Sequence, residues 1–262
     1  MKKDHGDYKT KPFPKMRRLV VDAGWMGHRR HMIHGLVEAD VTQARQYIRE
    51  HKARTGESLS FTAFIIACLG QAVDMDRYIH AYRNWRNQLI LFDEVDVLTM
   101  IEIEVGDRTF PLRHIIRAAN KKIFREIHQE IRAAQAAEPI KAADFKGWYL
   151  YLFLPTFIRR SFWRILSKRP HVRKRIAGTV GITSVGMFGQ GGGWGIGMPI
   201  HTLGITLGGI GEKPGVVDGR IEIREYLSVT ISFDHDIIDG APAARFTQQL
   251  KELIESGYGL SD

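Results

Sequence analysis

A two-residue turn signal near the C-terminal end of the sequence constrains the fold more than any other feature. Asp218-Gly219 separates Val216-Val217 from Ile221-Glu222-Ile223, and such a pair between apolar runs is the strongest short-range signal for a β-hairpin. A further strand pattern follows over residues 226–233, after which residues 241–255 adopt the helical period. The sequence therefore predicts an antiparallel hairpin and then an amphipathic helix.

The preceding residues add helices first and strands afterwards. A helical pattern begins at Asp40 and ends before Gly56, and Ser58 or Ser60 caps a second predicted helix. Strand patterns cover residues 89–92, 95–105, 178–186 and 205–207, whereas residues 111–137 have helical spacing. Early helices, late strands and one closing helix predict an α/β fold in which helices pack on a mixed β-sheet.

Composition places the chain among ordinary globular proteins. Of its 262 residues, 44% are apolar and 26% are charged, which excludes the disordered, collagenous and coiled-coil classes. The single cysteine, Cys68, excludes an internal disulfide, and its position on an apolar helical stripe indicates a core residue rather than a nucleophile. The start has no secretory signal and no apolar run is long enough to cross a membrane, so we expect a cytoplasmic protein.

The basic excess of the chain is concentrated in one quarter of the sequence. Residues 145–211 contain nine Lys and Arg residues and no acidic residue, while the whole chain carries a net charge of +9. Aromatic residues are mixed with the basic residues over 145–175, a combination that suits an anionic membrane surface or an acidic partner. We favour aromatic packing on the protein body with solvated arginines. No nucleic-acid recognition module is present, which disfavours a nucleic-acid partner.

The segment from Ser232 to Gly240 is the sharpest chemical feature. A strand runs into His235, a short loop carries Asp239-Gly240, and a helix begins near Ala241. A strand end holds an imidazole rigidly, and histidine is the usual general base near neutral pH. Taken alone, this spacing is equally compatible with an incidental surface histidine.

The same segment resembles the signature of the coenzyme-A-dependent acyltransferase superfamily, in particular the catalytic core of the dihydrolipoamide acyltransferases of 2-oxoacid dehydrogenase complexes. The similarity extends through Ala244-Arg245-Phe246 and covers the strand at 178–187, with weaker matches at 38–42 and 60–67. It implies a chloramphenicol-acetyltransferase-like α/β fold, a two-layer sandwich whose mixed sheet is covered by helices, assembled as a homotrimer. We expect an N-terminal arm over residues 1–15 and the catalytic domain over residues 16–262.

The resemblance also implies a role for each motif residue. His235 is the base that takes a proton from the thiol of coenzyme A or of a dihydrolipoyl group, and the thiolate attacks a thioester. The hydroxyl of Thr183 stabilises the resulting oxyanion. Asp239 is an architectural partner of an arginine, and the choice between Arg17 and Arg18 stays open.

Two further residues are candidates for the substrate channel, namely His31 and Ser184. His31 belongs to a group with His28 and His34 at a spacing of three, which is also compatible with a metal site. No carboxylate or thiol is interleaved, and Arg29-Arg30 would repel a cation. We therefore predict no metal and expect coenzyme A or acyl-CoA as substrate, with part of the basic excess serving its phosphates.

The sequence also departs from the family pattern. It contains no lipoyl domain and no subunit-binding domain, so we expect a separate lipoyl carrier or dehydrogenase subunits as partners. Residues 138–177 resemble an insertion, and the C-terminus differs from the tail that joins trimers into cages, which favours a free trimer. The alternative function is a noncatalytic scaffold or a membrane-peripheral interaction protein that keeps the fold.

Overall fold

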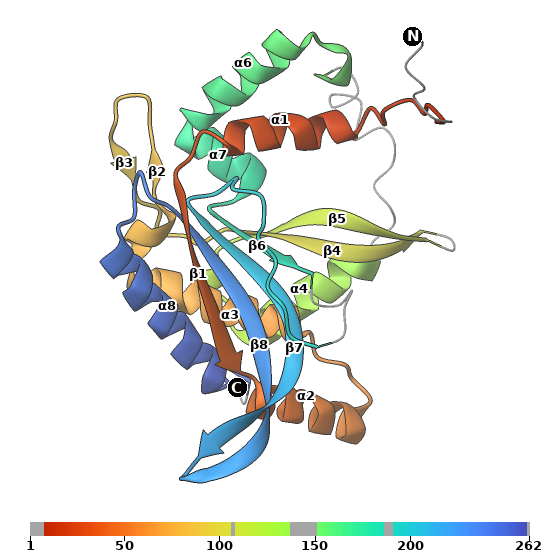
Figure 1. Ribbon diagram of the computed structural model, residues 1–262, viewed down its shortest axis with the longest axis vertical. Helices are drawn as coiled ribbons and strands as arrows, with labels where there is room; N and C mark the ends of the chain where they lie inside the picture. Colours follow the sequence, from red (N-terminus) through yellow and green to blue (C-terminus); the bar gives the residue numbers. More distant parts are fainter. Residues whose placement is uncertain (1–7, 106–107, 137–150, 186–190, 261–262) are drawn as a thin grey trace, which may run out of the picture.

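The computed structural model describes residues 8–105, 108–136, 151–185 and 191–260. Its main sheet has six strands in the order β1-β8-β7-β6-β4-β5 (Figure 1). The strands are β1 (Met32–Asp40), β4 (Val97–Val105), β5 (Arg108–Ile116), β6 (Val180–Ser184), β7 (Leu203–Val217) and β8 (Arg220–Asp234). β6 runs parallel to both of its neighbours and the other pairs are antiparallel, so the sheet is mixed, as predicted.

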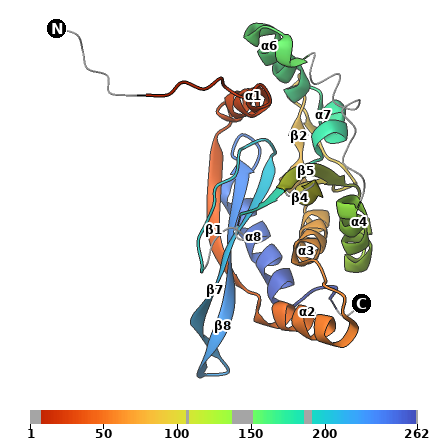
Figure 2. The ribbon, with the colours of Figure 1, turned by 90° about the vertical axis from the view of Figure 1, so that its right-hand side faces the viewer.

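The helices form two groups. α2 (Thr42–Thr55), α3 (Phe61–Met75), α4 (Phe124–Ala136) and α8 (Gly240–Glu255) cover one face of the sheet, and α1 (Arg17–Gly27), α6 (Thr156–Ser167) and α7 (Pro170–Ala177) lie at one end of it (Figure 2). The smaller elements are the short 3₁₀ helices at Arg77–His80 and Ala119–Lys121 and a two-stranded ribbon of β2 (Tyr82–Arg83) and β3 (Leu89–Ile90). None of the helices within the described ranges combines the length and apolar character needed to cross a bilayer.

The hydrophobic core lies between the sheet and the first group of helices. Phe64 of α3, Phe233 of β8 and Phe246 of α8 are fully buried, and the last two rings meet edge to face at 5.9 Å. Cys68 is buried on α3, which confirms the core assignment, and burial raises the pKa of its thiol. A buried neutral thiol is a poor nucleophile.

Local signals set several element boundaries as predicted. Asp218 and Gly219 both have positive φ angles and join β7 to β8 in the expected hairpin. Gly56 ends α2 in the left-handed conformation, and the hydroxyl of Ser60 caps α3 by accepting the backbone N–H of Ala63.

The helical prediction for residues 111–137 is wrong in its first part. Residues 108–116 form β5, and α4 begins only at Phe124. β5 is an edge strand, which tolerates Pro111 because a proline removes a donor that a central strand would need. Pairing of Ile116 with Val97 buries both side chains and overrides the local pattern.

The aromatic and basic segment packs only in part as expected. Tyr151 and Leu152 are buried, and the Tyr151 hydroxyl donates to Asp22 of α1 at 2.8 Å. Arg159 is also buried, against the prediction of solvated arginines, because its Nε donates to the same carboxylate at 2.8 Å. Phe153 is instead 65% exposed. The first part of the predicted insertion, residues 138–150, lies outside the described residues.

Candidate active site

The predicted general base, His235, comes directly after β8, the neighbour of the edge strand β1 in the sheet. β8 ends at Asp234, and the side chain of the next residue, His235, is exposed. The backbone N–H of His235 donates to the carbonyl of His31 at 2.7 Å, one step beyond the register pair of Met32 and Asp234. The sheet therefore fixes the backbone of His235 and leaves its imidazole accessible.

A largely buried ion pair lies at this strand end. Arg30 Nη1 donates to Asp234 Oδ2 at 2.8 Å, and the two side chains are 11% and 7% exposed. The other carboxylate oxygen of Asp234 accepts the backbone N–H of Asp236. No sequence pattern pointed to Arg30, since only its place before β1 brings it to the end of β8.

The candidate channel residue His31 lies beside the predicted base. Its Nδ1 lies 2.8 Å from Oδ1 of Asp236, and this hydrogen bond raises the pKa of His31 while it lowers the pKa of Asp236. Arg83 contacts the other oxygen of Asp236 at 3.5 Å. The pairing of β1 with β8 thus brings His31 and His235 together at one edge of the sheet.

Among the described residues, Asp239 has no arginine partner. Asp239 is exposed at the start of α8, and its side chain forms no hydrogen bond or ion pair with any described residue. Arg18 donates instead to the carbonyl of Leu152 at 2.8 Å, and Arg17 is exposed in the first turn of α1. The predicted pairing of Asp239 with either arginine stays a prediction.

The predicted oxyanion donor lies well away from His235 in the same chain. Thr183 on β6 pairs with Thr206 on β7, which pairs with Thr230 on β8. His235 is five residues further along β8, so at about 3.3 Å per residue and about 4.8 Å per strand the two residues are roughly 19 Å apart. One chain therefore cannot bring both side chains to one reacting carbonyl.

The second channel candidate, Ser184, follows Thr183 at the end of β6 and lines a cavity of about 520 Å³. Phe61 of α3 and Leu207 of β7 form apolar walls of the same cavity. His31 and Ser184 consequently lie at separate places in this chain.

No group of three or more metal-ligating side chains occurs in the part of the chain that the structure describes. His31 and His34, two members of the histidine group, have separate partners in Asp236 and Ser232. The imidazoles are engaged in hydrogen bonds that hold the edge of β1 to β8.

The sequence from the end of α6 to the C-terminus carries a recognisable family pattern. Residues 169–260 match the model of the 2-oxoacid dehydrogenases acyltransferase (catalytic domain). Over these residues the chain is similar to the catalytic domain of the 2-oxoacid dehydrogenase acyltransferases. Among those acyltransferases, the succinyltransferase component of the Rickettsia conorii 2-oxoglutarate dehydrogenase complex is 25% identical over 80% of this chain and 45% of its own length. The chain thus spans less than half of that curated relative.

Solved structures of such acyltransferases share the fold. The dihydrolipoamide acetyltransferase of Azotobacter vinelandii superposes with a TM-score of 0.70 at 19% identity, covering 99% of this chain and 96% of the other. A chloramphenicol acetyltransferase gives a TM-score of 0.52 at 14% identity, with coverage of 93% and 96%. The predicted chloramphenicol-acetyltransferase-like fold is therefore confirmed.

Proposed function

We propose that this protein is a coenzyme-A-dependent acyltransferase that moves an acyl group between coenzyme A and an acceptor thiol, a dihydrolipoyl group being the natural candidate. The observation that carries the proposal is the accessible imidazole of His235 at a strand end braced by the largely buried Arg30–Asp234 pair. The match of residues 169–260 to the acyltransferase catalytic domain supports it.

The proposed reaction is a direct transfer without an acyl-enzyme. His235 accepts the proton of the acceptor thiol, and the thiolate attacks the carbonyl carbon of the thioester. The tetrahedral oxyanion then collapses, the C–S bond to the first thiol breaks, and that thiolate takes the proton back from the imidazolium. A direct route agrees with Cys68, whose burial raises the pKa of its thiol.

The oxyanion donor in this proposal comes from a neighbouring copy of the chain. Thr183 is roughly 19 Å from His235 by strand register, so a homotrimer in which one copy supplies the base and the next supplies the hydroxyl satisfies the chemistry. In the Azotobacter vinelandii enzyme, a serine, a histidine and an asparagine four residues after it were investigated for their roles in the catalytic mechanism. Asp239 follows His235 by the same four positions.

The proposed partners are a separate lipoyl carrier and dehydrogenase subunits. The Rickettsia conorii relative is a component of a 2-oxoglutarate dehydrogenase complex, which supports this class of partner.

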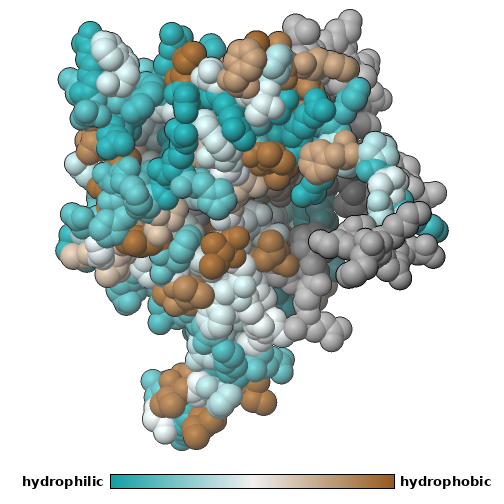
Figure 3. Space-filling view, turned by 45° about the horizontal axis from the view of Figure 1, so that its top comes forward, coloured by the Kyte–Doolittle hydropathy of each residue, from teal (hydrophilic) through white to brown (hydrophobic). Residues whose placement is uncertain are grey.

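Figure 3, with the α1 and α6 end brought forward, shows apolar side chains interspersed with hydrophilic ones. Phe153, Phe157 and Ile165 are 65%, 70% and 55% exposed there, and their basic surroundings suit an acidic partner or an anionic membrane surface. The buried single cysteine fits the proposed cytoplasmic location.

A donor screen tests the proposal. The protein is mixed with acyl-CoA donors and dihydrolipoamide, and release of coenzyme A is followed. His235→Ala is expected to reduce the turnover of the best donor by about 10²–10⁴-fold, the usual contribution of a general base, with an unchanged oligomeric state. Wild-type rates in this variant would refute the assigned base. A wild-type protein inactive with every donor would favour the noncatalytic scaffold.

A further inference from the structure

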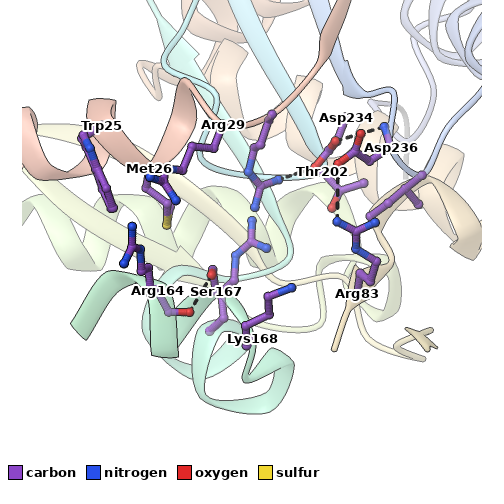
Figure 4. Close-up of a pocket in the computed structure, with 13 residues that line it drawn as sticks. Trp25, Met26, Arg29, Arg83, Arg164, Ser167, Lys168, Thr202, Asp234 and Asp236 are labelled. Atoms are coloured by element: carbon purple, nitrogen blue, oxygen red, sulfur yellow. Dashed lines mark hydrogen bonds and ion pairs between the residues drawn. The ribbon is translucent and has the colours of Figure 1, made fainter. Parts of the chain in front are cut away.

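A second cavity of about 350 Å³ opens between α1, α6, α7 and the end of β8 (Figure 4). Six cationic side chains line it: Arg29, Arg30, Arg83, Arg164, Lys168 and Arg173. They come from segments far apart in the sequence, so the fold assembles this concentration of positive charge.

The acidic residues of the cavity are already engaged. Asp234 pairs with Arg30, and Asp236 pairs with His31 and, at 3.5 Å, with Arg83. The other four cations, Arg29, Arg164, Lys168 and Arg173, form no ion pair with any carboxylate of the described residues. The cavity therefore has a local excess of positive charge.

Three guanidinium groups gather around one indole at the cavity wall. Arg29, Arg160 and Arg164 lie 4.2, 4.9 and 5.3 Å from the ring centroid of Trp25. Cation–π attraction holds each guanidinium individually, but the three positive charges repel one another. An anion placed between them would relieve that repulsion.

Arg173 gives an independent indication of a ligand. Its side chain is only 5% exposed and stacks on Tyr82 at 3.7 Å. One guanidinium nitrogen donates to the carbonyl of Ile200, whereas its buried Nε has no hydrogen-bond partner. Burial lowers the pKa of Arg173 to about 9, which leaves it cationic at neutral pH. A buried cation with an unused donor is costly unless an anion pairs with it.

We propose that this cavity binds a phosphate-bearing small molecule. The guanidinium forks suit phosphate oxygens, and the apolar wall formed by Trp25, Met26 and Ile237 suits an organic portion of the same ligand. The cavity volume falls in the range of small-molecule sites. Phosphates of coenzyme A and those of a separate organic phosphate offer the same chemistry. The site stands on its own charges and does not require that the chain transfer acyl groups.

Calorimetric titration with inorganic pyrophosphate at physiological ionic strength tests the site. The wild type is expected to bind one equivalent saturably. Arg164→Gln combined with Lys168→Gln should weaken binding by about tenfold or more, the equivalent of about 1.4 kcal/mol. The matched control combines Arg169→Gln with Arg175→Gln, which removes two exposed cations of the same segment that do not line the cavity. This control should stay within about twofold of the wild type.

Equal weakening in both double variants would show diffuse charge attraction and overturn the site, as would the absence of saturable binding at millimolar pyrophosphate. Competition identifies the source of the phosphate: displacement of pyrophosphate by coenzyme A assigns the site to that substrate, and binding of both together assigns it to a separate organic phosphate. His235→Ala should leave pyrophosphate affinity unchanged, because His235 does not line the cavity. Failure of acyl transfer and failure of anion binding are thereby distinguishable.

Discussion

The guanidinium of Arg30 and the carboxylate of Asp234 meet at 2.8 Å although 204 residues separate them in the sequence. Arg30 precedes β1 and Asp234 ends β8, so the pair joins the two strands next to His235. Because both side chains are nearly buried, each charge depends on the other for its solvation.

Breaking this pair should destabilise the protein. Arg30→Met leaves Asp234 as a nearly buried, uncompensated charge, so we expect the free energy of unfolding to fall by about 3 kcal/mol. Urea denaturation of Arg30→Met, Asp234→Asn and the double variant measures the coupling. The double variant should lose less than the sum of the two single losses, and strict additivity would show that the pair contributes nothing.

Mixed assemblies test whether the site is shared between copies. His235→Ala and Thr183→Val should each be inactive alone, since each removes one half of the proposed site. Co-expressed chains that assort at random should recover about a quarter of the wild-type activity, because one site in four then receives an intact histidine and an intact hydroxyl from different copies. No recovery in oligomers shown by mass spectrometry to be mixed would place both groups in one chain.

The His31–Asp236 pair predicts a pH dependence. The carboxylate raises the pKa of His31 above its ordinary value of 6.5, so the stabilisation is present at pH values below 6.5 and is lost as pH rises through the raised pKa. NMR titration should find a lower pKa for His31 in Asp236→Asn. The stability difference between wild type and variant should likewise shrink at alkaline pH. An unchanged His31 pKa in the variant would mean that the two side chains do not interact in solution.

Two glycines with similar positive φ angles should respond differently to alanine. Gly178 has a φ of 72°, and a Cβ there would lie 2.5 Å from the carbonyl oxygen of Asp96. Gly56 has a φ of 78° and no heavy atom within 4 Å of such a Cβ. We expect Gly56→Ala to cost about 1 kcal/mol for the backbone strain alone, and Gly178→Ala to cost at least about 2 kcal/mol. Thermal denaturation of both variants measures the two losses of stability. Equal losses would show that the added Cβ at position 178 meets no clash.

Local chemistry in the sequence was enough to predict the elements that depend on a few neighbouring residues. The Asp218-Gly219 turn, the Gly56 helix end and a serine cap at Ser58 or Ser60 each depend on the preferences of a few adjacent residues, and the structure shows that Ser60 is the cap. The strand end at His235 followed from the switch between strand and helix periods at that point. The helical assignment of residues 111–116 failed because β5 owes its conformation to pairing with β4, a contact that no local pattern reports.

By itself the sequence determined where the chain turns, which stripe is apolar and where a histidine meets a strand end, because these follow from the dihedral and burial preferences of adjacent residues. The tertiary structure alone decided which distant charges meet. It paired Arg30 with Asp234 and separated Thr183 from His235. It also gathered three arginine guanidinium groups around Trp25. Those relationships arise from strand order and helix packing, and electrostatic interactions depend on distance in space rather than along the chain.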